Sequence, residues 1–128
     1  MLGRLIGCGR ILIGLLAIAS PKLALRLFAL PRTNIDGTAS LITRLTGNRE
    51  LFLGAVLAFA PAARQPEWLG VSAAIDASDA AVSLLTLRDG LDKKAALLNA
   101  AAGATYAALE LIALRQAKTA LAEDAQRC

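Results

Sequence analysis

The 128-residue sequence has no histidine. Histidine is the most frequent ligand of zinc and haem iron, and it is the commonest general base near neutral pH. The chain also lacks a Ser-x-x-Lys pair, a glycine-rich phosphate loop and a cluster of metal-ligating residues. The sequence therefore indicates no catalytic residues, no metal site and no cofactor, and it favours a protein that is not an enzyme.

Aromatic residues and cysteines are also few. Three phenylalanines, one tryptophan and one tyrosine are scattered along the chain, and the 14 basic residues are also spread along it. A nucleic-acid-binding surface would gather basic residues beside aromatic stacking groups, so the sequence predicts no nucleic-acid partner. Cys8 and Cys128 stand at opposite ends without a C-x-x-C spacing, and no structural disulfide follows from them.

Hydrophobic residues, by contrast, are abundant. They make up 56% of the chain, and adding the ten glycines raises the share to about 64%, whereas charged residues fall to 19%. Soluble domains counted in the same way contain roughly 45–50%. The composition predicts a small membrane protein whose first partner is the lipid bilayer.

Four hydrophobic segments follow one another along the chain. They cover residues 4–20, 38–60, 68–87 and 93–114, and a charged tail follows at 115–128. Each is rich in alanine and leucine and poor in β-branched residues, which favours helix over strand. Segments of this length can cross about 30 Å of hydrocarbon at about 1.5 Å per residue. We therefore expect a single all-α domain, a four-helix transmembrane bundle.

Charges interrupt every segment, and the longest charge-free stretch, residues 95–109, has 15 residues. A transmembrane helix commonly has about 18 or more apolar residues in a row, so a soluble four-helix bundle remains an alternative. The membrane interpretation is favoured because a bundle in water needs a polar outer face, and here apolar residues surround each helix.

A short amphipathic helix is expected after the first span, within residues 21–31. Its leucines share one face, whereas Lys22 and Arg26 share another. This pattern is typical of a helix that lies in the membrane interface. In the alternative, the segment extends a kinked first helix.

The first segment also has the features of a signal peptide. Arg4 and Arg10 precede an apolar run that ends in Ala17-Ile18-Ala19. We favour a first helix that is retained. Basic residues are divided six against six between the two sides of the membrane, so the positive-inside rule gives no orientation.

The first two segments repeat one pattern. A shift of 40 residues places Arg4, Leu5, Gly7, Gly14 and Pro21 on Arg44, Leu45, Gly47, Gly54 and Pro61. The glycines of each copy lie seven residues apart on one face, where they allow close approach of helix backbones, so we assign helix packing to all four. Duplication and convergence both explain the pattern, and consecutive spans place the two copies antiparallel.

Small and polar residues recur at spacings of three and four on every segment. In the third segment they are Ser72, Asp76, Asp79, Ser83 and Thr86. Such a stripe occupies one helix face and points inward in a membrane bundle, while aliphatic residues face lipid. The stripes predict a buried polar network, and a possible ligand or ion site, formed by Arg10, Arg44, Arg49, Glu50, Asp76, Asp79, Asn99, Tyr106 and Glu110.

The charges of this network do not balance, since three arginines face four carboxylates. Asp76 and Asp79 lie one helical turn apart and repel each other when both are ionised, so one of them is expected to have a raised pKa. One hypothesis is that the spare carboxylate carries a proton or binds a cation or a basic ligand. The favoured alternative is a structural network that fixes the register of the helices.

Part of this pattern resembles a known group of proteins. Arg44-Leu-Thr-Gly47-Asn-Arg49, followed by Gly54 and Asp76-Ala-Ser-Asp79, is similar to the R-x-x-G-x-R … G … D-x-x-D pattern of uncharacterised small bacterial four-helix membrane proteins. The likeness extends over about residues 38–115. It implies a multi-pass protein of the bacterial cytoplasmic membrane with no established activity.

Two functions are consistent with these features. The favoured one is an accessory or interaction subunit without chemistry of its own, which packs against another membrane protein or a second copy of itself. The second is a proton- or cation-linked transport element that uses Asp76 or Asp79.

Overall fold

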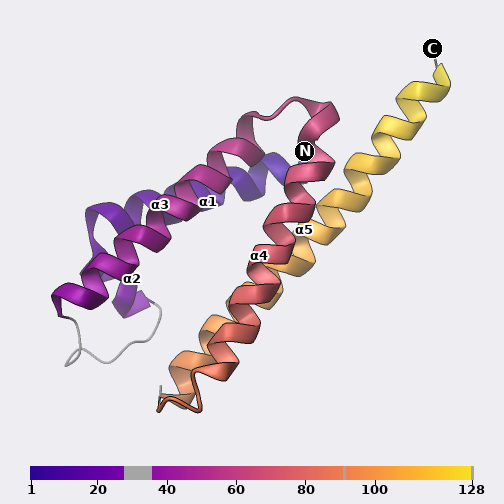
Figure 1. The fold of residues 1–128 in the computed structure, drawn as a ribbon. Helices are drawn as coiled ribbons and strands as arrows, with labels where there is room; N and C mark the ends of the chain where they lie inside the picture. The colour runs from indigo at the N-terminus through magenta and orange to yellow at the C-terminus, as the bar shows by residue number, and fades with distance from the viewer. Residues whose placement is uncertain (28–35, 91, 128) are drawn as a thin grey trace.

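The computed structural model describes residues 1–27, 36–90 and 92–127, and these ranges are helical without any strand. The helices are α1 (Leu2–Ala19), α2 (Pro21–Leu27), α3 (Gly37–Phe59), α4 (Gln65–Leu85) and α5 (Lys93–Arg127), with a 3-10 turn, η2 (Ala62–Arg64), before α4 (Figure 1). The predicted all-α class is confirmed. The four long helices lie over the four hydrophobic segments.

Local sequence explains where the later helices begin. Asp36 caps α3 by accepting a hydrogen bond from the backbone N–H of Ala39 at 2.7 Å, and Asp92 caps α5 by accepting one from Ala95 at 3.0 Å. Both aspartates satisfy backbone donors that the first turn of a helix leaves without a partner. Between α4 and α5 the chain turns at Gly90, whose φ of 85° suits glycine.

α1 and α3 lie side by side and run antiparallel (Figure 1). Their backbones touch at two places. A Cβ atom on Gly7 would lie 2.7 Å from the carbonyl oxygen of Gly54, and one on Gly14 would lie 2.6 Å from that of Gly47. The glycines to which the sequence assigns helix packing are thus the contact points of this pair. A shift of 40 residues exchanges one contact for the other, so an approximate two-fold axis relates the two helices.

α4 and α5 form a second antiparallel pair (Figure 1). Gly103 approaches α4 so closely that a Cβ atom there would lie 2.8 Å from the carbonyl oxygen of Asp76. Alanines are buried on both helices, among them Ala73 of α4 and Ala100 of α5. Small side chains therefore bring these two helices together, as glycine does for α1 and α3.

The two pairs meet at a junction instead of packing evenly around one bundle axis (Figure 1). Each long helix contributes one residue to a shared hydrophobic cluster of Ile6, Leu57, Leu69 and Ala113. Beside the cluster, Gln65 donates a hydrogen bond from Nε2 to the carbonyl oxygen of Leu57 at 3.0 Å. The four long helices are therefore arranged as two tight pairs, because the smallest residues face the partner within each pair.

Among the described residues, three stretches are long and apolar enough to cross a membrane, namely α1, η2 together with α4, and α5. α3 is not among them, because Arg44, Arg49 and Glu50 lie in its central turns. Large apolar side chains cover the outer surface, including Leu12, Leu15, Leu41, Val82, Leu97 and Ile112. Long apolar helices with exposed leucines are typical of a membrane protein.

α2 is a helix separate from α1, since Ser20 between them leaves the helical conformation at a φ of −138°. Its buried residues, Pro21, Ala24 and Leu25, lie where α2 packs against α1 and α3. Lys22, Leu23, Arg26 and Leu27 are exposed. The rest of the predicted short helix, at positions 28–31, lies outside the described residues.

α5 continues to Arg127 through the segment that the sequence assigns to a charged tail, and it extends past α4 (Figure 1). Alanine, glutamine, lysine and leucine dominate residues 116–122, and all four are strong helix formers, so nothing ends the helix at Leu114. Its 35 residues span about 52 Å, which exceeds the roughly 30 Å of a hydrocarbon core.

The glycine contacts predict a clear difference between two substitutions. Gly7→Ala should lower the free energy of unfolding by about 1–3 kcal/mol, because the new Cβ would lie 2.6 Å from the backbone nitrogen of Ala58. Gly70→Ala is the matched control, since nothing lies within 4 Å of a Cβ there and alanine favours helix by about 1 kcal/mol. Unfolding in detergent followed by circular dichroism measures both. Equal stability of the two variants would contradict the close contact.

Candidate functional site

The guanidinium of Arg10 lies at the junction of the two helix pairs and binds carboxylates from three other helices. Its Nη1 donates to Glu50 of α3, its Nη2 to Asp76 of α4, and its Nε and Nη2 donate to Glu110 of α5 at 3.1 and 2.8 Å. Its side chain is 1% exposed. One residue of α1 is therefore bonded to each of the other long helices.

Glu110 is the most enclosed of these carboxylates, with an exposed fraction of 0%. Its Oε1 accepts both hydrogen bonds from Arg10 and a third from the hydroxyl of Ser72 at 2.7 Å. Its Oε2 is buried and has no hydrogen-bond partner among the described residues. Glu110 thus concentrates its bonds on one oxygen, and it joins α5 to both α1 and α4.

A second ion pair lies beside the first. Arg49 of α3 donates from Nη1 and Nη2 to the two carboxylate oxygens of Asp79 at 3.1 and 2.6 Å, and from Nη2 to Glu50 at 2.9 Å. Glu50 therefore links Arg49 to Arg10. This pair is only half-enclosed, with side-chain exposures of 38% for Arg49 and 39% for Asp79.

Tyr106 completes the surroundings of Arg10. The guanidinium carbon lies 5.1 Å from the centre of the Tyr106 ring, within the range of a cation–π interaction. The ring stands on α5 one helical turn before Glu110. It therefore covers the side of the guanidinium that the carboxylates do not bond.

The close packing of α1 on α3 explains why Arg10 reaches Glu50. A Cβ atom on Gly54 would lie 2.9 Å from the Cβ of Arg10, so the backbones are too close for a side chain between them. Arg10 and Glu50 also occupy equivalent positions in the two copies of the 40-residue pattern. Their ion pair therefore lies near the approximate two-fold axis that relates α1 and α3.

The structure brings together seven of the nine residues assigned to the polar network and leaves two outside. Arg44 is exposed, because it projects about 60° to one side of Gly47 on the helical wheel whereas Glu50 projects about 60° to the other. Asn99 donates its side-chain amide to the carbonyl oxygen of Ala95 in its own helix at 2.8 Å. Neither residue bonds to the Arg10 cluster.

Gln65 is a buried polar residue that the sequence reasoning missed. Its side chain bonds α4 to the backbone of α3 at Leu57. The signal was present, because position 65 continues the stripe of Leu69, Ser72 and Asp76 at the same spacing of four, three and four. It was hidden by its place just before the predicted start of the segment at residue 68.

The loss of Arg44 from the network enlarges the charge imbalance. Arg10 and Arg49 supply two positive charges, and Glu50, Asp76, Asp79 and Glu110 supply four carboxylates. The excess is therefore two carboxylates instead of the one counted from the sequence. Asp76 and Asp79 do not share an arginine, because Asp76 bonds to Arg10 and Asp79 bonds to Arg49.

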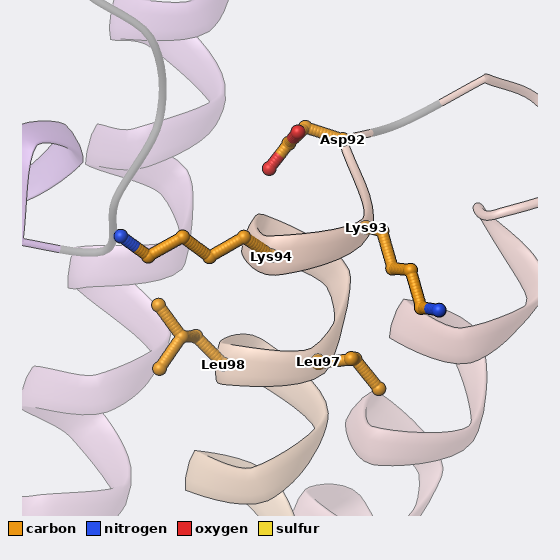
Figure 2. A pocket seen from close by; sticks show the side chains of 5 residues that line it. All are labelled: Asp92, Lys93, Lys94, Leu97 and Leu98. Carbon is orange, nitrogen blue, oxygen red and sulfur yellow. The ribbon is translucent and has the colours of Figure 1, made fainter.

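Two surface cavities of the described residues lie away from Arg10, Asp76 and Glu110. One, of about 590 Å³, opens at the start of α5 and is lined by Asp92, Lys93, Lys94, Leu97 and Leu98 (Figure 2). Figure 2 shows the two lysines directed to opposite sides of the helix, so they do not converge on one point. The second, of about 510 Å³, lies on the outer side of α3.

A family model for a domain of unknown function, DUF4267, matches residues 7–116. The chain belongs to this family. The DUF4267 match includes all four packing glycines and the whole ion-pair cluster, and it ends before the last turns of α5. Neither a curated protein nor a solved structure matches the chain. The expected membership of an uncharacterised family is confirmed.

Removing the central arginine tests the cluster. Arg10→Met should lower the free energy of unfolding by about 3–5 kcal/mol, because it leaves three buried carboxylates without their common partner. The deficit should shrink as the pH falls, since protonation removes the repulsion among the carboxylates. Arg44→Met, at an exposed position outside the cluster, should change stability by no more than about 0.5 kcal/mol.

Thermal or denaturant unfolding of the purified variants at several pH values gives their free energies of unfolding and the pH dependence of those free energies. Arg10→Met and Arg44→Met with equal stability at neutral pH would show that the cluster does not hold the fold together.

Proposed function

We propose that the chain crosses the membrane four times, with α3 as the fourth span beside α1, α4 and α5. The support is the contact of α3 with α1 at Gly7–Gly54 and Gly14–Gly47, which leaves no room for lipid or water between the two backbones. A helix in such contact with a spanning helix has the same depth in the bilayer. α2 then lies in the interface with Lys22 and Arg26 toward the headgroups, and the membrane that we propose is the bacterial cytoplasmic membrane, as the resemblance described above implies.

Within that membrane, the protein acts as an interaction subunit without chemistry of its own. The Arg10 cluster supports this role because every guanidinium nitrogen of Arg10 bonds to a carboxylate of the same chain. A network of this kind fixes the positions of four helices and occupies four of the five N–H donors of Arg10. Association with another membrane protein then uses the outer surface.

One observation carries the proposal, namely the half-exposed ion pair between Arg49 and Asp79. It lies near the middle of α3, at a depth where lipid is apolar and a charged side chain costs about 2.5 kcal/mol or more. The exposed amide of Asn48 adjoins it. Polar groups at this depth are stabilised when a neighbouring helix covers them. The face of α3 that carries Asn48 and Arg49 is therefore the surface on which a partner docks.

A photo-crosslinking residue placed on α3 tests the interaction role. In native membranes, a crosslinker at Leu45 of α3 should join the protein to one membrane protein in stoichiometric yield. The matched control is Leu12 of α1, which is also exposed but has no polar neighbour of this kind, and it should give lipid adducts only. A chain that forms no protein adduct at Leu45, or the same adducts at both positions, would overturn the proposal.

Proton-linked transport is a second candidate, supported by the two excess carboxylates and the unpartnered Oε2 of Glu110. Two uncompensated charges at this depth are costly, so the cluster is more stable when it retains protons. Vesicles containing the protein should then dissipate a proton gradient, and Asp76→Asn should abolish the flux while the helices stay folded. Asp89→Asn, in the turn after α4, is the control. Flux no faster than in protein-free vesicles would exclude this candidate.

A further inference from the structure

The outer face of α3 carries a regular stripe that has no partner within the described chain. Its residues are Leu41, Leu45, Asn48, Phe52, Ala55 and Phe59, at spacings of four, three, four, three and four. This is the heptad spacing with which one helix packs along another. Leu45 is 61% exposed and Phe59 is 80% exposed, so neither α1 nor α4 covers the stripe.

The centre of the stripe combines a polar residue with a hollow. Asn48 is exposed and lies halfway between Leu41 and Ala55. The cavity of about 510 Å³ on the outer side of α3 is lined by Asn48, Arg49, Leu51, Phe52 and Ala55. A side chain from an apposed helix could therefore enter the surface beside the Asn48 amide, as a knob enters a hole in a coiled coil.

We propose that a second copy of this chain occupies the stripe, so that the protein is a homodimer packed through α3. The proposal rests on the proposed function, because it names the partner of the same surface. Two copies of one membrane protein insert in the same orientation, and a two-fold axis between them is normal to the membrane. The two α3 helices then run parallel, and each residue of the stripe meets its own counterpart at the same depth.

Asn48 is the residue best suited to such a meeting. An amide has both donors and an acceptor, so two Asn48 side chains bond to each other, whereas two like charges would repel. A single asparagine in an otherwise apolar heptad stripe fixes register and stoichiometry. An unrelated partner would need its own polar residue at this depth, and a second copy supplies one by symmetry.

Charged residues stand on both flanks of the stripe. Arg44 stands on one side of the stripe, and the Arg49–Asp79 ion pair stands on the other. In two parallel helices, a residue on one flank meets the opposite flank of its partner about five positions further on. Arg44 of one copy therefore lies near Arg49 of the other, and the charge of that Arg49 is already paired with Asp79 of its own chain.

Cysteine crosslinking in lipid vesicles tests the dimer. In a background with Cys8→Ser and Cys128→Ser, oxidation should convert Leu45→Cys and Phe52→Cys into covalent dimers, and the control Leu12→Cys on α1 should stay monomeric. Vesicles of purified protein contain no other protein, so any covalent dimer there joins two copies. Monomers at both α3 positions, or dimers as abundant at position 12, would overturn the inference.

The role of Asn48 is measured by energy transfer between donor- and acceptor-labelled copies at falling protein-to-lipid ratios. Asn48→Leu should weaken dimerisation about 3- to 30-fold, as expected for one lost interhelical hydrogen bond. Thr46→Leu is the control, because Thr46 is exposed on the helix face opposite Asn48, about 160° away on the helical wheel, and its hydroxyl donates to the backbone carbonyl oxygen of Ile42. Equal dimerisation of the two variants would contradict the amide pair.

The same α3 cysteines in native membranes separate this inference from the proposed function. Covalent adducts with a different membrane protein, and none between copies, would overturn the homodimer and leave the interaction role intact. The absence of any protein adduct in vesicles and in native membranes would overturn both.

Discussion

Four helices of this protein converge on one guanidinium. Arg10 holds Glu50, Asp76 and Glu110, and its side chain is 1% exposed, so Asp76 and Glu110 depend on it for charge compensation away from water, whereas Glu50 also bonds to Arg49. Ion pairs at an exposed surface contribute little, but the loss of one member of a buried set leaves the others uncompensated. The two helix pairs have few other contacts with each other. Their relative position therefore depends on this cluster and on the small hydrophobic cluster beside it.

The contacts within each pair depend on small side chains and not on charge. α1 and α3 approach through glycines whose missing side chains let the backbones touch, and α4 and α5 approach through Gly103 and buried alanines. In a bilayer the hydrophobic effect does not drive helices together, so close van der Waals packing and interhelical hydrogen bonds must do so. Glycine contacts thus form the pairs, and the arginine cluster then joins one pair to the other.

The sequence was most informative where helix geometry links position to direction. The spacing of Gly7 and Gly14, and of Asp76 and Glu110 within their stripes, places each on an inner face, because successive residues turn by about 100°. The sequence pattern predicted Arg44 to be part of the polar network because Arg44 lies near Gly47 along the chain. On the helix, however, it projects to the opposite side of the glycine face from Glu50. The division into two pairs could not be predicted, since it depends on contacts between residues far apart in the chain. The exposed stripe around Asn48 became visible only once the packed faces of α3 were known.

The central claim is that Arg10 holds the two helix pairs at one relative position. The most direct measurement is the distance between spin labels at Leu41 of α3 and Leu97 of α5, in cysteine-free protein reconstituted in lipid with an excess of unlabelled copies, with and without Arg10→Met. Labels at Leu15 and Leu41 report the distance within the α1–α3 pair. We predict a single narrow distance between pairs in the parent protein, a broad distribution in Arg10→Met, and an unchanged distance within the pair. A narrow distance between pairs that survives the substitution would contradict it.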